Sequence, residues 1–147
     1  MEQRKKVNEL SFDEWQKTIP DYIRNDPLWE SGYYRLALYL YDLVWQDCGL
    51  LKRDFRGREI AGQIIRSAGG ICANLEEAYG RGVGTADYVR VMRIALGEAR
   101  ETRGWYFRAR RILPPELLSH RATLTGKLIA MLSSTISSHR NNLGKSS

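Results

Sequence analysis

The sequence contains few of the residues that build disulfide frameworks or metal sites, and it lacks long apolar runs. Two cysteines and two histidines occur among its 147 residues. Cys48 and Cys72 stand isolated in apolar sequence, so we interpret them as buried thiols rather than as a disulfide or metal ligands. No apolar run approaches the roughly 20 residues of a membrane-spanning helix, and the N-terminus lacks the apolar core of a signal peptide. We therefore expect a cytoplasmic protein with no metal, no cofactor and no membrane partner.

The motifs of common enzyme classes are also absent. The sequence has no P-loop, no HExxH, no GxSxG and no GxGxxG after a strand. His120 and His139 have no carboxylate or cysteine at ligand spacing. Because no activated nucleophile, acid–base pair or metal cluster can be recognised, we expect no catalytic residues and no enzymatic activity.

Helical periodicity is the main signal that the sequence does contain. Four long stretches repeat apolar residues at helical spacing, and no stretch of similar length alternates with a period of two. The connections between them are short, which predicts antiparallel neighbours and hence an all-α, up-down-up-down four-helix bundle. The expected long helices cover approximately residues 27–51, 58–79, 85–113 and 115–139.

Both ends of the chain are expected to lie outside this bundle. Ser11 and Glu14 have the spacing of a capping box, which predicts a short helix within an N-terminal extension of residues 1–27. The bundle itself is expected to span residues 28–139. The polar residues 140–147 are expected to form a disordered tail.

Positive charge is concentrated near the third expected helix. The chain has 23 basic and 17 acidic residues, giving a formal net charge of +6. Residues 81–111 contain eight arginines, three acidic residues and no lysine. Helical spacing places most of these arginines opposite the side that should face the core. The residues that we predict to contact nucleic acid are Arg81, Arg90, Arg93, Arg100, Arg108 and Arg111.

Three interpretations of this arginine stripe remain open from the sequence. The arginines can form an ordinary solvated helix face, because arginine is a good helix former. They can instead pair with Glu98, Glu101 or acidic residues of another subunit. The third interpretation, which we favour, is that they bind the phosphate backbone of RNA or DNA without reading base sequence. These roles can coexist, since a symmetric assembly multiplies the charge of one subunit.

Aromatic residues and glycines outside the expected core suggest a further contact surface. On the first long helix, an aromatic stripe lies opposite the core stripe and needs cover from the N-terminal segment or from a second subunit. Glycines within the second and third helices cost roughly 1 kcal/mol each relative to alanine, which suggests close approach of another backbone. We therefore predict an oligomer interface that includes Tyr34, Tyr41, Trp45, Gly62, Gly69, Gly97 and Gly104.

A polar stripe accompanies the core face of the second helix. It holds Gln63, Arg66, Asn74 and Glu77 at helical spacing. Periodicity alone leaves open whether such a stripe is solvated or forms a satisfied buried network. With Glu101 on the third helix, we expect a network that ties these two helices together.

Two central motifs carry a resemblance to a known family. The run GQIIRSAGGICANLEEAYGRG, followed by DYVRVMRIALGEARET, resembles the four-helix-bundle family of 23S rRNA intervening-sequence proteins. The resemblance covers approximately residues 28–138, and it departs from the family pattern at Cys72, where proline is frequent. Positions that match the pattern include Gln63, Arg66, Asn74, Glu77, Arg81, Tyr88, Arg90, Gly97 and Glu101.

The resemblance carries its own expectations about assembly and function. It implies an all-α bundle that forms a homopentamer with a central channel and has no enzymatic activity. A related branch, the accessory variability proteins of diversity-generating retroelements, consists of similar basic pentamers that bind a reverse transcriptase and nucleic acid. We therefore expect a homo-oligomer that binds RNA or DNA. The alternative is an interaction scaffold or accessory subunit, for example of a reverse transcriptase, whose arginine stripe builds a protein interface.

Overall fold

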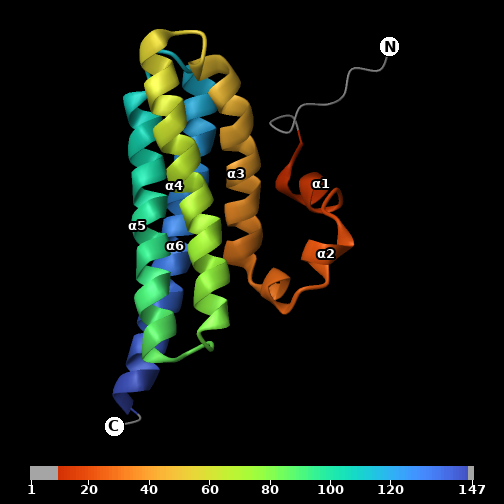
Figure 1. Ribbon diagram of the computed structural model, residues 1–147, viewed down its shortest axis with the longest axis vertical. Coiled ribbons are helices and arrows are strands. Elements are labelled where there is room, and N and C mark those ends of the chain that lie inside the picture. The colour runs from red at the N-terminus through yellow and green to blue at the C-terminus, as the bar shows by residue number, and fades with distance from the viewer. Residues whose placement is uncertain (1–9, 146–147) are drawn as a thin grey trace.

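The stretches with helical periodicity form four long helices packed side by side (Figure 1). The structure, a computed structural model, describes residues 10–145. Within them the chain alternates in direction through α3 (Gly32–Leu51), α4 (Phe55–Gly80), α5 (Ala86–Arg108) and α6 (Pro115–Lys145). No strand occurs among the described residues. The predicted all-α fold and its up-down-up-down order are confirmed.

One side of each long helix is buried, as the apolar spacing predicts. Leu40, Ile71, Ala95 and Leu132 are fully buried and represent the four helices in a single core. Among the polar residues of the core, Ser67 Oγ and Thr102 Oγ1 lie 2.8 Å apart and join α4 to α5. The core stripe therefore determines which side of every helix is left to face outward.

The N-terminal extension covers part of the aromatic side of α3. It contains α1 (Phe12–Gln16), α2 (Asp21–Arg24) and the 3-10 helix η2 (Pro27–Glu30). Ser11 caps α1 by accepting a hydrogen bond from the Glu14 amide at 3.1 Å. The Trp15 ring is buried, and its Nε1 donates to Asp42 Oδ2 at 2.8 Å. The extension is therefore packed onto the bundle, although its residues 1–9 lie outside the described part.

Capping side chains and glycines set the turns and helix ends. Some helix boundaries differ from those expected from the sequence. Gly82 and Gly84 take positive φ angles of 92° and 89° between α4 and α5, and Thr85 Oγ1 caps α5 by accepting from the Tyr88 amide. Asp54 caps α4 and starts it at Phe55 rather than at residue 58. The helix α5 ends at Arg108, before the expected residue 113, and a series of turns leads on to α6.

The end of α6 corrects one expectation. Residues 140–145 continue the helix, where the sequence predicts a disordered polar tail. The apolar side chain of Leu143 packs against the core and gives this segment an anchor. Residues 146 and 147, the rest of the predicted tail, lie outside the described residues.

Candidate nucleic-acid interface

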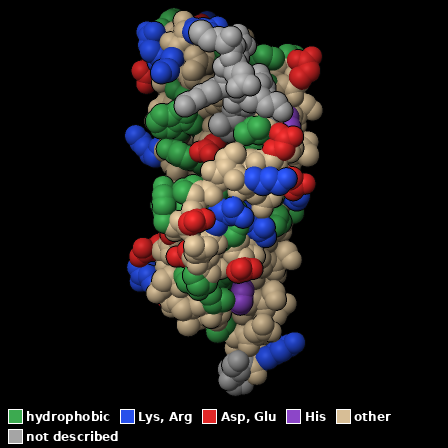
Figure 2. Space-filling model, turned by 90° about the vertical axis from the view of Figure 1, so that its right-hand side faces the viewer, with side chains coloured by type: hydrophobic (Ala, Val, Ile, Leu, Met, Phe, Trp, Pro, Cys, Tyr) green, Lys and Arg blue, Asp and Glu red, His purple; other side chains and the backbone are tan. Residues whose placement is uncertain are grey.

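The outward side of α5 and the turns that follow it carry a surface of exposed arginines, which we call the arginine face. It is exposed because the small and apolar residues of α5, such as Ala95 and Ala99, turn toward the core. The opposite side of the bundle, which bears the N-terminal extension, shows acidic and basic side chains intermixed (Figure 2). The members of the arginine face are Arg90, Arg93, Arg100, Arg103, Arg108, Arg110 and Arg111.

Acidic neighbours neutralise the start of this surface. Arg81, in the turn before α5, lies 2.9 Å from Glu77 and 3.0 Å from Asp87. Arg90 also contacts Asp87, at 2.9 Å. The hydrogen bond from Arg90 lowers the pKa of the Asp87 carboxyl below its ordinary value, and Arg81 adds to this effect. Of the predicted nucleic-acid residues, Arg81 and Arg90 therefore have the least free charge.

The remainder of the arginine face has no such neutralisation. Within residues 10–145, no carboxylate forms an ion pair with Arg93, Arg100, Arg103 or Arg111. The sequence between Glu101 and Glu116 contains no acidic residue. Since α-helices rise 1.5 Å per residue, Arg93 and Arg103 are about 15 Å apart along the axis. From Arg93 onward, α5 and the turns after it therefore present a row of free guanidinium groups.

Aromatic rings accompany the arginines at the C-terminal end of α5. The Arg108 guanidinium lies 4.6 Å from the centroid of the Trp105 ring, and it also occupies the space beside Gly104, 3.5 Å from the position of a Cβ there. The Arg110 guanidinium lies 4.2 Å from the centroid of the Phe107 ring. Phe107, Arg103 and Arg110 are not among the nucleic-acid-binding residues predicted from the sequence. The spacing of Arg103 and Arg110, four residues before and three after an aromatic residue, could have identified them.

The predicted polar network between α4 and α5 is not formed as expected. Gln63, Arg66 and Glu77 are exposed, and the half-buried Asn74 donates to the Gly70 carbonyl of its own helix at 2.8 Å. Glu101 is also exposed, and it pairs with a second carboxyl group instead of with α4. The reason is geometric, because this stripe lies at the rim of the helix pair rather than within it.

The second carboxyl group belongs to Glu98, which lies over the backbone of α4. A Cβ at Gly70 would lie 2.9 Å from Glu98 Cδ, so the glycine makes room for this side chain. Burial raises the pKa of Glu98, and the charge of Glu101 and a hydrogen bond with it raise it further. Gly70 therefore has a packing role at the contact between α4 and α5.

A buried polar cluster joins three helices on the other side of the core. Arg121 Nε and Nη2 donate to the two carboxylate oxygens of Asp47 at 2.7 and 2.9 Å. The Tyr106 hydroxyl donates to the same carboxylate at 2.6 Å. Burial and the Asp47 charge raise the pKa of Tyr106 well above its ordinary value, so it remains a donor. This network of α3, α5 and α6 was missed from the sequence, where the only signal is a carboxylate on an apolar helix side.

His120 extends this cluster and makes it sensitive to pH. Its Nδ1 accepts from Arg121 Nη1 at 2.7 Å, which requires that nitrogen to be unprotonated. Burial and the Arg121 charge lower the pKa of His120 from its ordinary value of 6.5. The unfolded chain therefore takes up the proton at a higher pH than the folded chain does.

We predict that stability is fully present above the unfolded pKa of His120 and falls as the pH drops through its folded pKa. Urea denaturation at a series of pH values from about 8 to about 5 measures this loss. The replacement His120→Gln should remove this loss of stability. The loss that protonation of carboxylates causes at lower pH should remain. If the free energy of unfolding depends on pH in the same way in both proteins, the assignment to His120 is contradicted.

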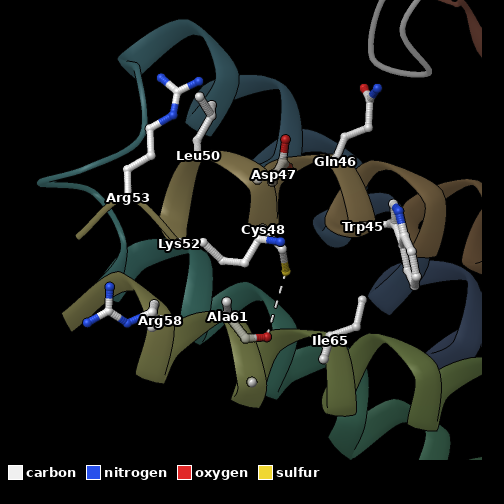
Figure 3. Close-up of a pocket in the computed structure, with 12 residues that line it drawn as sticks. Trp45, Gln46, Asp47, Cys48, Leu50, Lys52, Arg53, Arg58, Ala61 and Ile65 are labelled. Atoms are coloured by element: carbon white, nitrogen blue, oxygen red, sulfur yellow. Dashed lines mark hydrogen bonds between the residues drawn. The ribbon is translucent and has the colours of Figure 1, made fainter. Parts of the chain in front are cut away.

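A groove between α3 and α4 contains two of the residues predicted at the oligomer interface. It has a volume of about 840 Å³, and its lining includes Trp45, Leu50, Gly62 and Ile65 (Figure 3). Trp45 is 65% exposed, and a Cβ at Gly62 would meet no atom within 4 Å. Arg53 and Arg58 lie at the end of the groove away from Trp45, and the Lys52 side chain extends toward Cys48 between the two ends, as Figure 3 shows.

The other predicted interface residues have different surroundings. Tyr34 is buried and donates to Glu76 at 2.7 Å. Tyr41 is half-buried and packs on Gly69, where a Cβ would lie 3.4 Å from the ring. The predicted interface role is therefore wrong for the buried Tyr34, whereas Tyr41 and Gly69 contact each other and remain partly exposed, so their role at an interface stays a prediction. Gly97 is exposed, with open space around it.

The described residues contain neither a membrane-spanning helix nor a cluster of metal ligands. None of the helices there has the length and apolar character needed to cross a lipid bilayer. No group of three or more histidine, cysteine or acidic side chains in residues 10–145 is arranged to hold a metal ion. Cys72 is buried, and Cys48 is half-buried with its thiol directed at the Ala61 carbonyl, 3.7 Å away. The prediction of a buried thiol is confirmed for Cys72, whereas Cys48 is partly exposed.

Comparison with known proteins identifies relatives of the bundle. The profile of the 23S rRNA-intervening sequence protein family matches residues 33–134. The chain is similar to the crystal structure of a protein with unknown function from the S23 ribosomal protein family of Bacteroides thetaiotaomicron. That similarity has a TM-score of 0.63 and 25% sequence identity, and it covers 71% of this chain and 97% of the other. No curated protein matches the chain. The matched residues span α3 to most of α6, so the chain belongs to the 23S rRNA-intervening sequence protein family.

Proposed function

We propose that this protein is a non-enzymatic, homo-oligomeric bundle that binds the phosphate backbone of nucleic acid, with RNA as the preferred ligand. The observation that carries the proposal is the row of exposed arginines without ion pairs among the described residues along α5 and the turns after it, which continues into a stretch without acidic residues between Glu101 and Glu116. Guanidinium groups bind phosphates in a planar, two-bond geometry that suits this task. The family's name, which refers to 23S ribosomal RNA, favours RNA as the first ligand to test.

Self-association would strengthen such binding. A ring of copies would repeat the arginine face and raise the local positive potential, so several weak phosphate contacts would act together. The resemblance to the family implies a pentamer. The groove between α3 and α4 offers a surface for the contact, because it contains both the exposed apolar ring of Trp45 and the unobstructed backbone of Gly62.

The salt dependence of RNA binding tests the proposed activity. A protein that neutralises Z phosphates of a single strand loses affinity with a slope of about −0.7Z in a plot of log K against log salt concentration. We expect the free arginines of one protomer to give a slope of about −2 or steeper between ~50 and ~200 mM salt. Absence of RNA binding at the lower salt concentration, or binding independent of salt, would contradict the proposal.

A substitution in the groove tests the assembly. Gly62→Gln should improve the helix by about 1 kcal/mol while blocking close approach of another backbone. We therefore expect a smaller mass by size-exclusion chromatography with light scattering, together with an unchanged or higher melting temperature. Gly126→Gln is the matched control, because that position also has open space around it but lies on α6. A Gly62→Gln protein with the mass of the unmodified protein would exclude this groove as the interface.

The alternative function is that of a scaffold or accessory subunit, with a reverse transcriptase as one possible partner. In that case the arginine face would contact a neighbouring subunit or a partner protein instead of RNA. The mass of arginine variants separates the two functions. Variants that become monomers without a change in helicity would favour a structural role for the arginine face.

A further inference from the structure

Phe107 is an exposed aromatic residue in the middle of the arginine face. Its side chain is 64% exposed, so the core does not use it. Arg103 precedes it by four residues, about one helical turn, and Arg100 by seven, about two turns. The Arg110 guanidinium lies against the ring at 4.2 Å, and the exposed Arg111 follows directly. Single exposed apolar residues are common on proteins, but this one has arginines on both sides and no acidic neighbour.

We propose that the arginine face binds single-stranded nucleic acid, with one unpaired base stacked on Phe107. This inference rests on the proposed function and specifies its ligand class. An aromatic ring can stack only on a base whose face is accessible, and in a duplex the base faces are covered by their neighbours in the stack. A surface that combines guanidinium groups with an exposed ring therefore favours the single strand.

The arrangement around Phe107 supplies the two contacts that such a ligand needs. One side of the ring carries the Arg110 guanidinium, which also donates to the Phe107 carbonyl at 3.2 Å and so stays near the ring. The exposed remainder of the ring is open to a base. Arg100 and Arg103, on the two preceding turns, are placed to contact the phosphates of adjacent nucleotides. Stacking thus fixes one nucleotide while the arginines hold the backbone around it.

The two ends of α5 differ in how much of their positive charge is free. At the beginning, Asp87 neutralises Arg81 and Arg90. Free positive charge thus extends from Arg93 onward, and the exposed ring of Phe107 lies within this part of the surface. The second exposed phenylalanine beside an arginine, Phe55, differs in this respect because Asp54 binds the Arg56 that lies over its ring.

The test compares one RNA in two states. A labelled 12-nucleotide RNA without self-complementarity is titrated as a single strand and as the duplex with its complement. We expect the unmodified protein to bind the single strand at least about fivefold more tightly, as one base–aromatic stack provides. Phe107→Leu keeps an apolar side chain and should lose this preference, while duplex affinity changes less than about twofold. Phe107→Trp should retain the preference.

Phe55→Leu is the matched control, because Phe55 is 68% exposed and also contacts an arginine. It should bind both RNA states as the unmodified protein does, and light scattering should give the same mass for all variants. Equal affinity for both states, or an equal loss for both in Phe107→Leu, would overturn the stacking role while leaving backbone binding intact. Absence of binding to either state at low salt would instead contradict the proposed function itself.

Discussion

Replacement of Asp47 by alanine is expected to lower the free energy of unfolding by about 3–5 kcal/mol. The Asp47 carboxylate is buried and accepts hydrogen bonds from both Arg121 and Tyr106. Its removal would leave the Arg121 guanidinium buried without a counter-charge and the Tyr106 hydroxyl without an acceptor. The cost of the uncompensated charge is larger than the net value of the original pair, because burial removes the solvation that an exposed charge retains.

Urea denaturation followed by circular dichroism measures this effect. Asp21→Ala on α2 is a suitable control, because that carboxylate is exposed and its loss should change stability by less than about 0.5 kcal/mol. The double replacement Asp47→Leu with Arg121→Met should recover part of the loss, since it removes both charges. If Asp47→Ala unfolds at the same urea concentration as the unmodified protein, the cluster does not hold the three helices together.

Reversal of two charges on the arginine face should have the largest effect on nucleic-acid binding. Each arginine that neutralises one phosphate of a single strand contributes a factor of about eight to affinity at ~50 mM salt, from the slope of −0.7 per contact. Loss of two such contacts lowers affinity about 60-fold. The pair Arg93→Glu with Arg100→Glu also adds repulsion, so the decrease should exceed about 100-fold. A filter-binding or fluorescence anisotropy titration with a single-stranded RNA measures it.

The control for this experiment changes the net charge equally at another place. Lys17→Glu with Arg24→Glu modifies the N-terminal extension, on the side of the bundle away from α5 (Figure 1). We expect that variant to lose less than about fivefold in affinity, through the weakened overall field alone. An equal loss in both variants would show that binding follows net charge and not the arginine face. Circular dichroism should show unchanged helicity in each.

Much of the fold could be predicted because its determinants are local. The buried stripe of each helix repeats within one or two turns, so the core residues of α4 and α5 are recognisable from spacing alone. The caps Ser11 and Thr85, and the positive-φ glycines Gly82 and Gly84, act within a few residues of their position. The arginines of α5 are exposed for the same reason, because the apolar side of the helix is buried and they lie on its other side.

The parts that could not be predicted depend on contacts between helices. Asp47 binds partners 59 and 74 residues away in the chain, and no short-range pattern indicates that pairing. The glycines illustrate the same limit. Gly70 makes room for Glu98 of the same chain. Gly69 lies at ordinary contact distance from Tyr41, whereas Gly62 has open space, although the sequence assigns Gly62 and Gly69 to the same predicted interface.

The sequence by itself determined the helices, their buried sides and the concentration of arginine on α5, because periodicity and capping act over a few residues. Only the tertiary structure decided which distant charges pair. It buried Asp47 with Arg121, 74 residues away, and left Arg100 and Arg103 without acidic partners within residues 10–145, whereas Asp87 pairs with Arg90 only three residues away. The physical reason is that an ion pair depends on the distance between side chains in space, and helix packing sets that distance for residues far apart in the chain.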